Sequence, residues 1–251
     1  MPIVMSKAQK LVPEHGYYRS KLKQNIDHKR AVARELLSQN LIHDGDPMVL
    51  DAGTSVSIAA ELIFASDLKN LSILTHSIAV FQQFYEGTQG GGHEVLLTGG
   101  GFDQNYNALY GKVAESAYSA FNARVVILAI SGLTALKDLA HEPGIYCHAV
   151  VETRLKEILF KLPTDRRIIV ADYTKIGHVD SHLFGTIGEI KSNVLSGGDC
   201  LITTEPPADT PAEEVRLFRE TIDQLKEWKV NVYAIPAPQA GASASESGSP
   251  E

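Results

Sequence analysis

Short apolar runs alternate with segments of helical periodicity along most of this chain, and the alternation limits the folds that it can adopt. Such a pattern is typical of a mainly parallel β-sheet that is flanked by helices. The sequence therefore predicts an α/β fold of that kind. Strands are expected at residues 48–50, 71–75, 94–97, 125–130, 167–171 and 200–203, with a candidate edge strand at 230–235, and helices at 26–41, 56–65, 78–85, 111–121, 151–162 and 211–228.

Composition excludes several classes of protein. A chain of 251 residues, 44% of them hydrophobic and 21% charged, can bury a substantial core. No stretch approaches the roughly 20 apolar residues that a membrane span needs, and residues 1–10 lack the apolar block of a secretory signal, so we expect a cytoplasmic protein with no membrane partner. Cys147 and Cys200 have no metal-ligand spacing and are too few for a disulfide scaffold. We expect both to be buried, and we expect no metal site and no cofactor.

Charge is distributed unevenly along the chain. Residues 1–34 hold eight Lys or Arg against two acidic residues, a balance of +6, so the net charge of −7 leaves −13 for the remainder. A basic segment can contact nucleic acid, but a solvated helix face is at least as common a cause. We divide the chain into a basic N-terminal arm at residues 1–25, one domain at 26–235 and a tail at 236–251. The tail is rich in Pro, Ala, Gly, Ser and Glu and is expected to be disordered.

One turn suggests an anion-binding site. The predicted strand at 48–50 runs into Asp51, Gly53, Thr54, Ser55 and Ser57, and a helix follows. The start of a helix presents free backbone N–H groups and the positive end of the helix dipole, which suits a phosphate. The hydroxyl groups could donate to the same phosphate, and the aspartate could accept from a sugar hydroxyl. The alternative is an ordinary capped helix after a tight turn. The run matches neither Gly-x-Gly-x-x-Gly nor a Walker loop, which disfavours dinucleotides and nucleoside triphosphates.

Further small and hydroxylated turns follow the other predicted strands. In an open parallel sheet the ligand crevice lies outside the carboxyl ends of the strands, so these turns are expected to converge with the first one. Taken singly, each could be an ordinary connection between a strand and a helix. His76 is more typical of a partly buried histidine whose ring nitrogens are hydrogen-bonded within the protein. The turns are Thr75-His76-Ser77, Thr98-Gly99-Gly100-Gly101 and Ser131-Gly132-Leu133-Thr134.

Four charged residues complete the candidate site. Glu152 and Lys156 are one helical turn apart, where they could pair with each other on the surface. Asp172 and Lys175 follow the apolar run at 168–170, so they are expected at the edge of the sheet where the turns converge. A lysine there could reach a phosphate, and the aspartate could hold it in place.

The ordered set of these motifs resembles the effector-binding domain of the DeoR family of bacterial transcriptional regulators. The resemblance implies a domain related to ribose-5-phosphate isomerase and glucosamine-6-phosphate deaminase, a sugar-phosphate effector and a homo-oligomeric regulator. It extends from about residue 27 to residue 204. Its motifs are His28-Lys29-Arg30-Ala31-Val32-Ala33, Asp44-Gly45-Asp46, Leu50-Asp51-Ala52-Gly53-Thr54-Ser55, Leu74-Thr75-His76-Ser77, Thr98-Gly99-Gly100, Gly111, Glu152-Thr153-Arg154-Leu155-Lys156, Ala171-Asp172-Tyr173-Thr174-Lys175-Ile176-Gly177 and Leu201-Ile202-Thr203-Thr204.

The chain also departs from the family pattern. The roughly 25 residues before residue 27 are too few for the winged helix-turn-helix of these regulators, so we expect no direct sequence-specific DNA binding. His76 stands where the family usually has Asn, and the turn at 131–134 differs from the usual acidic-glycine pattern. The chain lacks the Lys-Gly-rich loop of the isomerases and the Asp-Gly-His loop of the deaminases.

Three functions are compatible with these residues. The first is a non-catalytic sensor of a phosphorylated sugar or a related small metabolite, acting in transcription. The second is an aldose–ketose isomerase of phosphorylated sugars, which needs a base such as Asp51, Glu152 or Asp172 and a stabilising donor such as Lys156 or Lys175. The third is a structural subunit that binds no small molecule. We expect the sensor.

Overall fold

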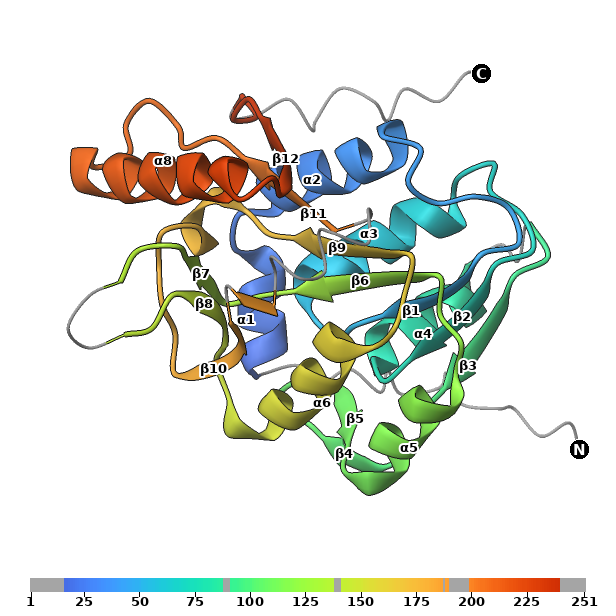
Figure 1. The fold of residues 1–251 in the computed structure, drawn as a ribbon. Coiled ribbons are helices and arrows are strands. Elements are labelled where there is room, and N and C mark those ends of the chain that lie inside the picture. Colours follow the sequence, from blue (N-terminus) through green and yellow to red (C-terminus); the bar gives the residue numbers. More distant parts are fainter. Residues whose placement is uncertain (1–15, 88–90, 138–140, 187, 190–198, 240–251) are drawn as a thin grey trace, which may run out of the picture.

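The centre of the molecule is a seven-stranded sheet in which all neighbouring strands are parallel (Figure 1). The computed structural model describes residues 16–87, 91–137, 141–186, 188–189 and 199–239. The sheet confirms the predicted α/β fold and all seven predicted strands. In spatial order its strands are β12 (Asn231–Ile235), β11 (Cys200–Thr204), β9 (Arg166–Val170), β6 (Val125–Ala129), β1 (Pro47–Leu50), β2 (Ser72–Thr75) and β3 (Glu94–Leu97).

Helices cover both faces of the sheet, and each face has its own hydrophobic core. Successive strand residues point to opposite faces, so Met48 and Leu50 of β1 pack in one core while Val49 packs in the other. The first core is closed by α2 (Ile26–Ser38), α3 (Thr54–Phe64) and α4 (Ile78–Glu86). The second is closed by α5 (Lys112–Ala120), α6 (Val150–Lys161) and α8 (Ala212–Glu227). Because both faces of the sheet are covered, strands such as β6 are continuous apolar runs in the sequence.

Several short elements were not predicted from the sequence. Most of the missed strands contain glycine or polar residues instead of the apolar runs that marked the main-sheet strands, and a seven-residue helix shows barely two turns of periodicity. A hairpin is formed by β4 (Gly101–Asp103) and β5 (Ala108–Tyr110), and a three-stranded antiparallel sheet by β7 (Gly132–Thr134), β8 (Gly144–Cys147) and β10 (His182–Thr186). The others are α1 (Tyr17–Lys23) and the 3₁₀ helix η1 (Tyr173–Lys175).

The helix α1 packs on the domain, although the sequence suggested an arm for residues 1–25. The Tyr18 side chain is buried and its hydroxyl donates to Ser57 Oγ at 2.9 Å, while its backbone N–H donates to Asn105 O at 2.9 Å. The buried Lys29 ammonium donates to the carbonyls of Lys21 and Gln24 at the end of α1. Residues 16–25 are therefore part of the folded unit. Residues 1–15, and residues 240–251 of the predicted tail, lie outside the described part.

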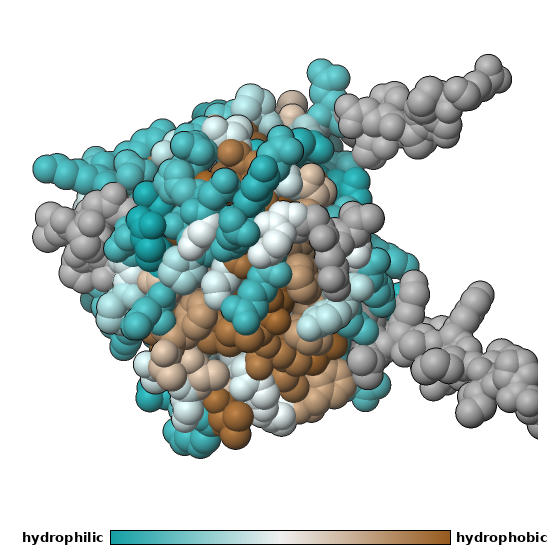
Figure 2. All heavy atoms as spheres, turned by 90° about the vertical axis from the view of Figure 1, so that its right-hand side faces the viewer, coloured by the Kyte–Doolittle hydropathy of each residue, from teal (hydrophilic) through white to brown (hydrophobic). Residues whose placement is uncertain are grey.

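Apolar side chains gather on the face that Figure 2 shows, which is the side of the molecule where the sheet ends at β3. Elements on this side carry Tyr85, Leu96, Phe102 and Val113, each between 39% and 60% exposed. Exposed apolar patches are typical of protein–protein interfaces. Assembly into a homo-oligomer stays a prediction, and this face is where we would expect the contact.

Other expectations concern cysteines, metals and membranes. Cys147 and Cys200 are buried free thiols, and burial raises their pKa values to about 11 and about 12. Among the described residues, no group of three or more His, Cys, Asp or Glu is arranged to hold a metal ion. None of the described helices has the length and apolar character needed to cross a membrane.

Candidate functional site

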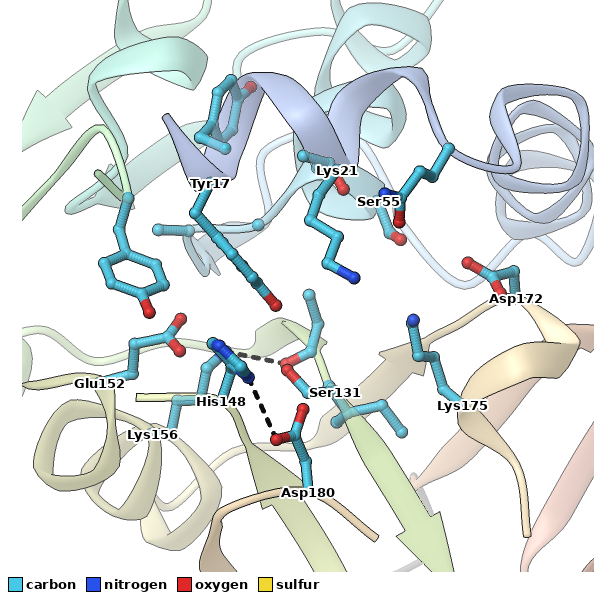
Figure 3. A pocket seen from close by; sticks show the side chains of 18 of the residues that line it. Tyr17, Lys21, Ser55, Ser131, His148, Glu152, Lys156, Asp172, Lys175 and Asp180 are labelled. Carbon is cyan, nitrogen blue, oxygen red and sulfur yellow. Dashed lines mark hydrogen bonds and ion pairs between the residues drawn. The ribbon is translucent and has the colours of Figure 1, made fainter. Parts of the chain in front are cut away.

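A cavity of about 380 Å³ lies at the carboxyl ends of β1, β6 and β9, with α1 as its opposite wall (Figure 3). The position is the one expected for a ligand crevice in an open parallel sheet. Its lining residues come from six segments: Tyr17, Tyr18, Lys21, Gln24, Asn25 and Lys29; Ala52, Gly53, Thr54 and Ser55; Tyr106 and Tyr110; Ala129, Ile130 and Ser131; His148, Glu152 and Lys156; and Asp172, Lys175, Val179 and Asp180.

The turn after β1 faces this cavity. Gly53 has to be a glycine because a Cβ there would lie 2.6 Å from the Cβ of Ala129 at the end of β6. The helix α3 begins at Thr54, and the first backbone N–H groups of a helix have no acceptor within it. In the described part of the chain, the amides of Thr54, Ser55 and Val56 have no acceptor, and the hydroxyls of Thr54 and Ser55 have no partner. The turn can therefore donate several hydrogen bonds to an anion.

Three lysines surround the same end of the cavity, which we call the cationic end. Lys21 of α1 and Lys175 of η1 extend towards each other into the cavity, and neither ammonium makes an ion pair or hydrogen bond with another described residue (Figure 3). Lys29 lies nearby, with its ammonium held by the carbonyls at the end of α1. Burial lowers the pKa of Lys29 to about 8.

Asp172 has a structural task at the cationic end. Its Oδ1 accepts hydrogen bonds from the Thr174 backbone N–H at 3.1 Å and from Asn25 Nδ2 at 3.2 Å. The first bond caps η1, and the second ties the residue between α1 and α2 to the end of β9. Asp172 thus orients the turn that carries Lys175. One carboxylate among three lysines leaves this end with a net positive charge.

Asp51 and Lys156 form a buried ion pair below the cavity. Lys156 Nζ lies 2.5 Å from Asp51 Oδ2 and donates to Ala129 O at 2.8 Å. Asp51 also accepts from the backbone N–H groups of Ala52 and Ala129, at 2.8 and 3.0 Å. Burial acts to lower the pKa of Lys156, but the carboxylates of Asp51 and Glu152 outweigh it and the pKa is raised. Asp51 is fully buried, so the role of sugar ligand suggested for it would require the pair to open.

Glu152 lies at the other end of the cavity, away from Lys21 and Lys175 (Figure 3). Its Oε2 accepts from the Ala149 backbone N–H at 3.2 Å at the start of α6, so the carboxylate is held in place. The side chain is buried, and burial raises the pKa of this carboxyl. Tyr106 and Tyr110 also line the cavity, and they lie close enough to Glu152 for its charge, after burial, to raise the pKa values of both hydroxyls. We call this the Glu152 end.

Two lining residues that the sequence did not single out, His148 and Asp180, meet beside Tyr17. The rings of Tyr17 and His148 are stacked, with centroids 4.7 Å apart and planes 7° from parallel. His148 Nδ1 is 3.1 Å from Asp180 Oδ1 (Figure 3). The pairing spans α1, the start of α6 and the segment before β10. Neither residue follows a strand of the main sheet, so the rule that located the other site residues could not have found them.

Besides Asp51, six predicted site residues do not line the cavity. Ser57 accepts from Tyr18, and Thr75 donates to Leu50 O at 2.7 Å. Ser77 is the N-cap of α4. Gly99 and Gly100 lead into the β4–β5 hairpin, where a Cβ on Gly100 would lie 2.5 Å from Tyr110 O. These residues support the segments that line the cavity, but they do not line it themselves.

His76 is the sixth of them and lies in the core below the site. Its Nδ1 is 2.6 Å from the Tyr118 hydroxyl, and its Nε2 is 3.7 Å from Asp51 Oδ1. Burial lowers the pKa of His76 to about 4, so the ring is neutral at physiological pH. The arrangement is that of a satisfied buried histidine.

The remaining predicted residues are brought together as expected. Gly53, Thr54, Ser55, Lys156, Asp172 and Lys175 all line the cavity, as does Glu152, which the sequence suggested only for an isomerase. The wall formed by α1 was missed. A weak signal for it exists in the aromatic pair Tyr17-Tyr18 within a basic segment, since arms that stay solvated rarely carry two adjacent aromatic side chains.

The sequence places the chain in a known family. Residues 24–196 match the model of the DeoR C terminal sensor domain, which is more than half of the chain. The chain belongs to this family, as the resemblance of its motifs implied.

Curated relatives of this chain are repressors. It is 26% identical over 191 residues to the HTH-type transcriptional repressor GlcR of Bacillus subtilis, covering 76% of this chain and 64% of GlcR. It is 23% identical over 206 residues to the lactose phosphotransferase system repressor of Staphylococcus aureus, covering 82% of this chain and 73% of that protein. Among solved structures, a ribose 5-phosphate isomerase from Plasmodium falciparum is 14% identical with a TM-score of 0.39, covering 59% of this chain and 51% of that one.

Proposed function

We propose that this sensor domain acts in transcriptional regulation by binding a small phosphorylated sugar in the cavity between α1 and the strand ends. The observation that carries the proposal is the turn at residues 53–55, whose free amides face the cavity beside the ammonium groups of Lys21 and Lys175. A phosphate would accept from the amides of residues 54–56 and from the hydroxyls of Thr54 and Ser55. The helix dipole of α3 and the nearby lysines would add favourable electrostatics.

The rest of the cavity supports a sugar as the remainder of the ligand. Its volume of about 380 Å³ suits a small metabolite. Its walls combine aromatic rings, which pack against the C–H faces of sugars, with polar groups for hydroxyls. The rings are those of Tyr17 and Tyr106, and the polar groups are the Ser131 hydroxyl and the His148–Asp180 pair.

An aldose–ketose isomerase is the second candidate, and the observation that favours it is the carboxylate of Glu152 in the cavity wall. An isomerase needs a base that reaches the substrate carbon. Asp51 is bonded to Lys156 and Asp172 caps η1, so Glu152 is the base that such an enzyme would use. The sensor is preferred because the carboxylates other than Glu152 have structural tasks.

A ligand screen tests the proposal directly. Thermal unfolding of the protein would be measured with a panel of phosphorylated sugars, their unphosphorylated parents and inorganic phosphate, because a ligand of the native state stabilises it by mass action. We expect stabilisation by phosphorylated sugars and not by the parents. Each hit is then incubated in D₂O and followed by NMR. Incorporation of deuterium at carbon would establish the isomerase, and stabilisation by no phosphorylated sugar would reject both functions.

The substitution Lys175→Ala tests the position of the phosphate. If its ammonium bonds to the phosphate, the variant should bind a sugar phosphate hit about tenfold or more weakly, the effect of losing a hydrogen bond of about 1.5–3 kcal/mol to a charged group. Isothermal titration calorimetry measures the affinity. Lys226→Ala on the exposed side of α8 is the matched control and should keep the wild-type affinity. Equal affinities of both variants would remove Lys175 from the site.

A further inference from the structure

The buried groups below the Glu152 end contain one positive charge too few. Two carboxylates, Asp51 and Glu152, are 0% and 8% exposed, and a single ammonium, that of Lys156, is buried with them at 4%. The neighbouring ring of His76 stays neutral because burial lowers its pKa to about 4. Buried charges are normally paired, and leaving one uncompensated is strongly unfavourable. The cluster therefore carries an unbalanced negative charge at the cavity wall.

The imbalance is located at Glu152. The Lys156 ammonium is already used by Asp51 Oδ2 and by a backbone carbonyl. Among the described residues, Glu152 receives one hydrogen bond, from the Ala149 backbone N–H to its Oε2. The hydroxyl of Tyr110, a residue of the cavity wall, is buried without a hydrogen-bond partner in the described part of the chain. The Glu152 carboxylate therefore has hydrogen-bonding capacity left for a group in the cavity, and the Tyr110 hydroxyl has unused capacity in the cavity wall.

We propose that the ligand is a phosphorylated amino sugar whose ammonium group pairs with Glu152 while its phosphate occupies the cationic end. The inference rests on the proposed function and specifies the class of ligand. The two ends of the cavity have opposite charge, with Lys21 and Lys175 at one and Glu152 at the other (Figure 3). Lys29 is close enough to Lys21 and Lys175 to feel their charges, so it belongs to the cationic end. A zwitterion with its charges at opposite ends matches that separation. A phosphorylated sugar without an amine matches only the cationic end.

The aromatic rings at the Glu152 end strengthen the preference for a cation. Tyr106 and Tyr110 line this end, and a ring face attracts an ammonium group most when water is excluded. An ammonium has three donors, enough for the Glu152 carboxylate and the Tyr110 oxygen together. A sugar hydroxyl could make the same hydrogen bonds but would leave the negative charge unbalanced. A proton on Glu152 could also balance it, and in that case no preference for an amine would be observed.

Matched pairs of ligands separate these possibilities. Calorimetric titration of the wild-type protein would compare glucosamine 6-phosphate with glucose 6-phosphate, and galactosamine 6-phosphate with galactose 6-phosphate, so that each pair differs only by an amine for a hydroxyl. For at least one pair we expect the amine to bind about tenfold or more tightly, as for a charge-assisted hydrogen bond. The N-acetyl form of the preferred amino sugar, which lacks the positive charge, should lose this advantage.

The substitution Glu152→Gln assigns the preference to its residue. Glutamine keeps the shape of the side chain and removes the charge, so the affinity ratio between amine and hydroxyl should fall to near one. Glu157→Gln, on the outer side of the same helix where the carboxylate pairs with Arg154 at 3.2 Å, is the control and should keep the wild-type ratio. Circular dichroism of both variants checks that the fold is retained, and the comparison of ligands on wild type stands without either variant.

The outcomes distinguish this inference from the proposed function. A hexose phosphate that binds as tightly as its amino counterpart in every pair overturns the inference and leaves the sensor of phosphorylated sugars in place. A preference for the amine that survives in Glu152→Gln overturns the role of Glu152. Failure of every phosphorylated ligand to bind overturns the inference together with the proposed function.

Discussion

At the scale of single residues, the ion pair of Lys156 and Asp51 is the contact on which the site rests. Removing one partner of a buried pair strands the other charge in a medium of low polarity, so Lys156→Met should destabilise the protein by about 3–5 kcal/mol. The loss should be larger than usual because Glu152, which shares this single ammonium with Asp51, loses its favourable interaction with it as well. Unfolding in urea measures it.

A surface lysine of the same helix provides the comparison. Lys161 at the end of α6 pairs with Glu189 while its side chain is 58% exposed. Lys161→Met should therefore change the unfolding free energy by no more than about 1 kcal/mol. Similar losses in the two variants would mean that the Lys156 pair is solvated in the native protein.

The partner of Lys156 could not be predicted from the sequence. The four-residue spacing of Glu152 and Lys156 predicts a contact between them. In the structure the lysine bonds instead to Asp51, more than a hundred residues earlier in the chain. Spacing reports neighbours on one helix, whereas the choice of partner depends on which strand end the helix crosses. The residues of the site were recognisable, but their pairing was not.

At the scale of elements, α1 is held by tertiary contacts rather than by its own sequence. It has seven residues, and its N-cap Gly16 makes no side-chain hydrogen bond. Isolated helices of that length are unstable in water. The contacts that order it come from Tyr18, which reaches Ser57, and from Lys29, which holds the carbonyls at its end. Neither contact can be read from periodicity, which explains why the segment was expected to be a solvated arm.

The substitution Lys29→Met should loosen α1 and leave the rest of the domain folded. Methionine fills the buried space but donates no hydrogen bond to Lys21 O and Gln24 O, and hydrogen bonds to charged groups stabilise by about 1.5–3 kcal/mol each. Amide hydrogen exchange at residues 17–23 should therefore become faster by about tenfold or more. Mass spectrometry of peptides measures the rates.

The control and the effect of ligand belong to the same experiment. Lys23 is exposed at the end of α1, and Lys23→Met should leave exchange unchanged. A ligand that contacts both Lys21 and Lys175 should slow exchange in α1 of the wild type, because α1 forms one wall of the cavity. Unchanged exchange in Lys29→Met would mean that the aromatic contacts alone hold the helix.

At the scale of the whole molecule, the parallel sheet explains why much of the site was predictable. Parallel strands bring all their carboxyl ends to one edge, so small and charged residues after the strands at 48–50, 125–130 and 167–171 had to converge. The structure brings the turns after β1, β6 and β9 to one cavity. Residues after β2 and β3 lie farther along the sheet and stay below the cavity or outside it. The order of strands, which decides this difference, is not visible in the sequence.

The stability of the whole molecule should fall as the pH is lowered from 6.5 towards 4, through His76. Its ring is buried among Asp51, Lys156, Tyr110 and Tyr118, and burial lowers its pKa from 6.5 to about 4. In this interval His76 binds a proton in the unfolded chain but stays neutral in the folded protein. Its contribution to the free energy of unfolding is therefore fully present above pH 6.5 and is lost as the pH falls. The difference amounts to on the order of 3 kcal/mol.

Other groups contribute to the same profile, so the test compares variants. Burial raises the pKa of Glu152, and its contribution changes in the opposite direction, growing as the pH falls. Urea unfolding at several pH values should give a smaller acid loss in His76→Gln than in the wild type. Tyr118→Phe removes the partner of His76 but leaves the ring buried, and should keep the wild-type slope. A slope that is the same in His76→Gln and the wild type would show that the ring accepts a proton in the folded protein, with Asp51 as the acceptor of its charge.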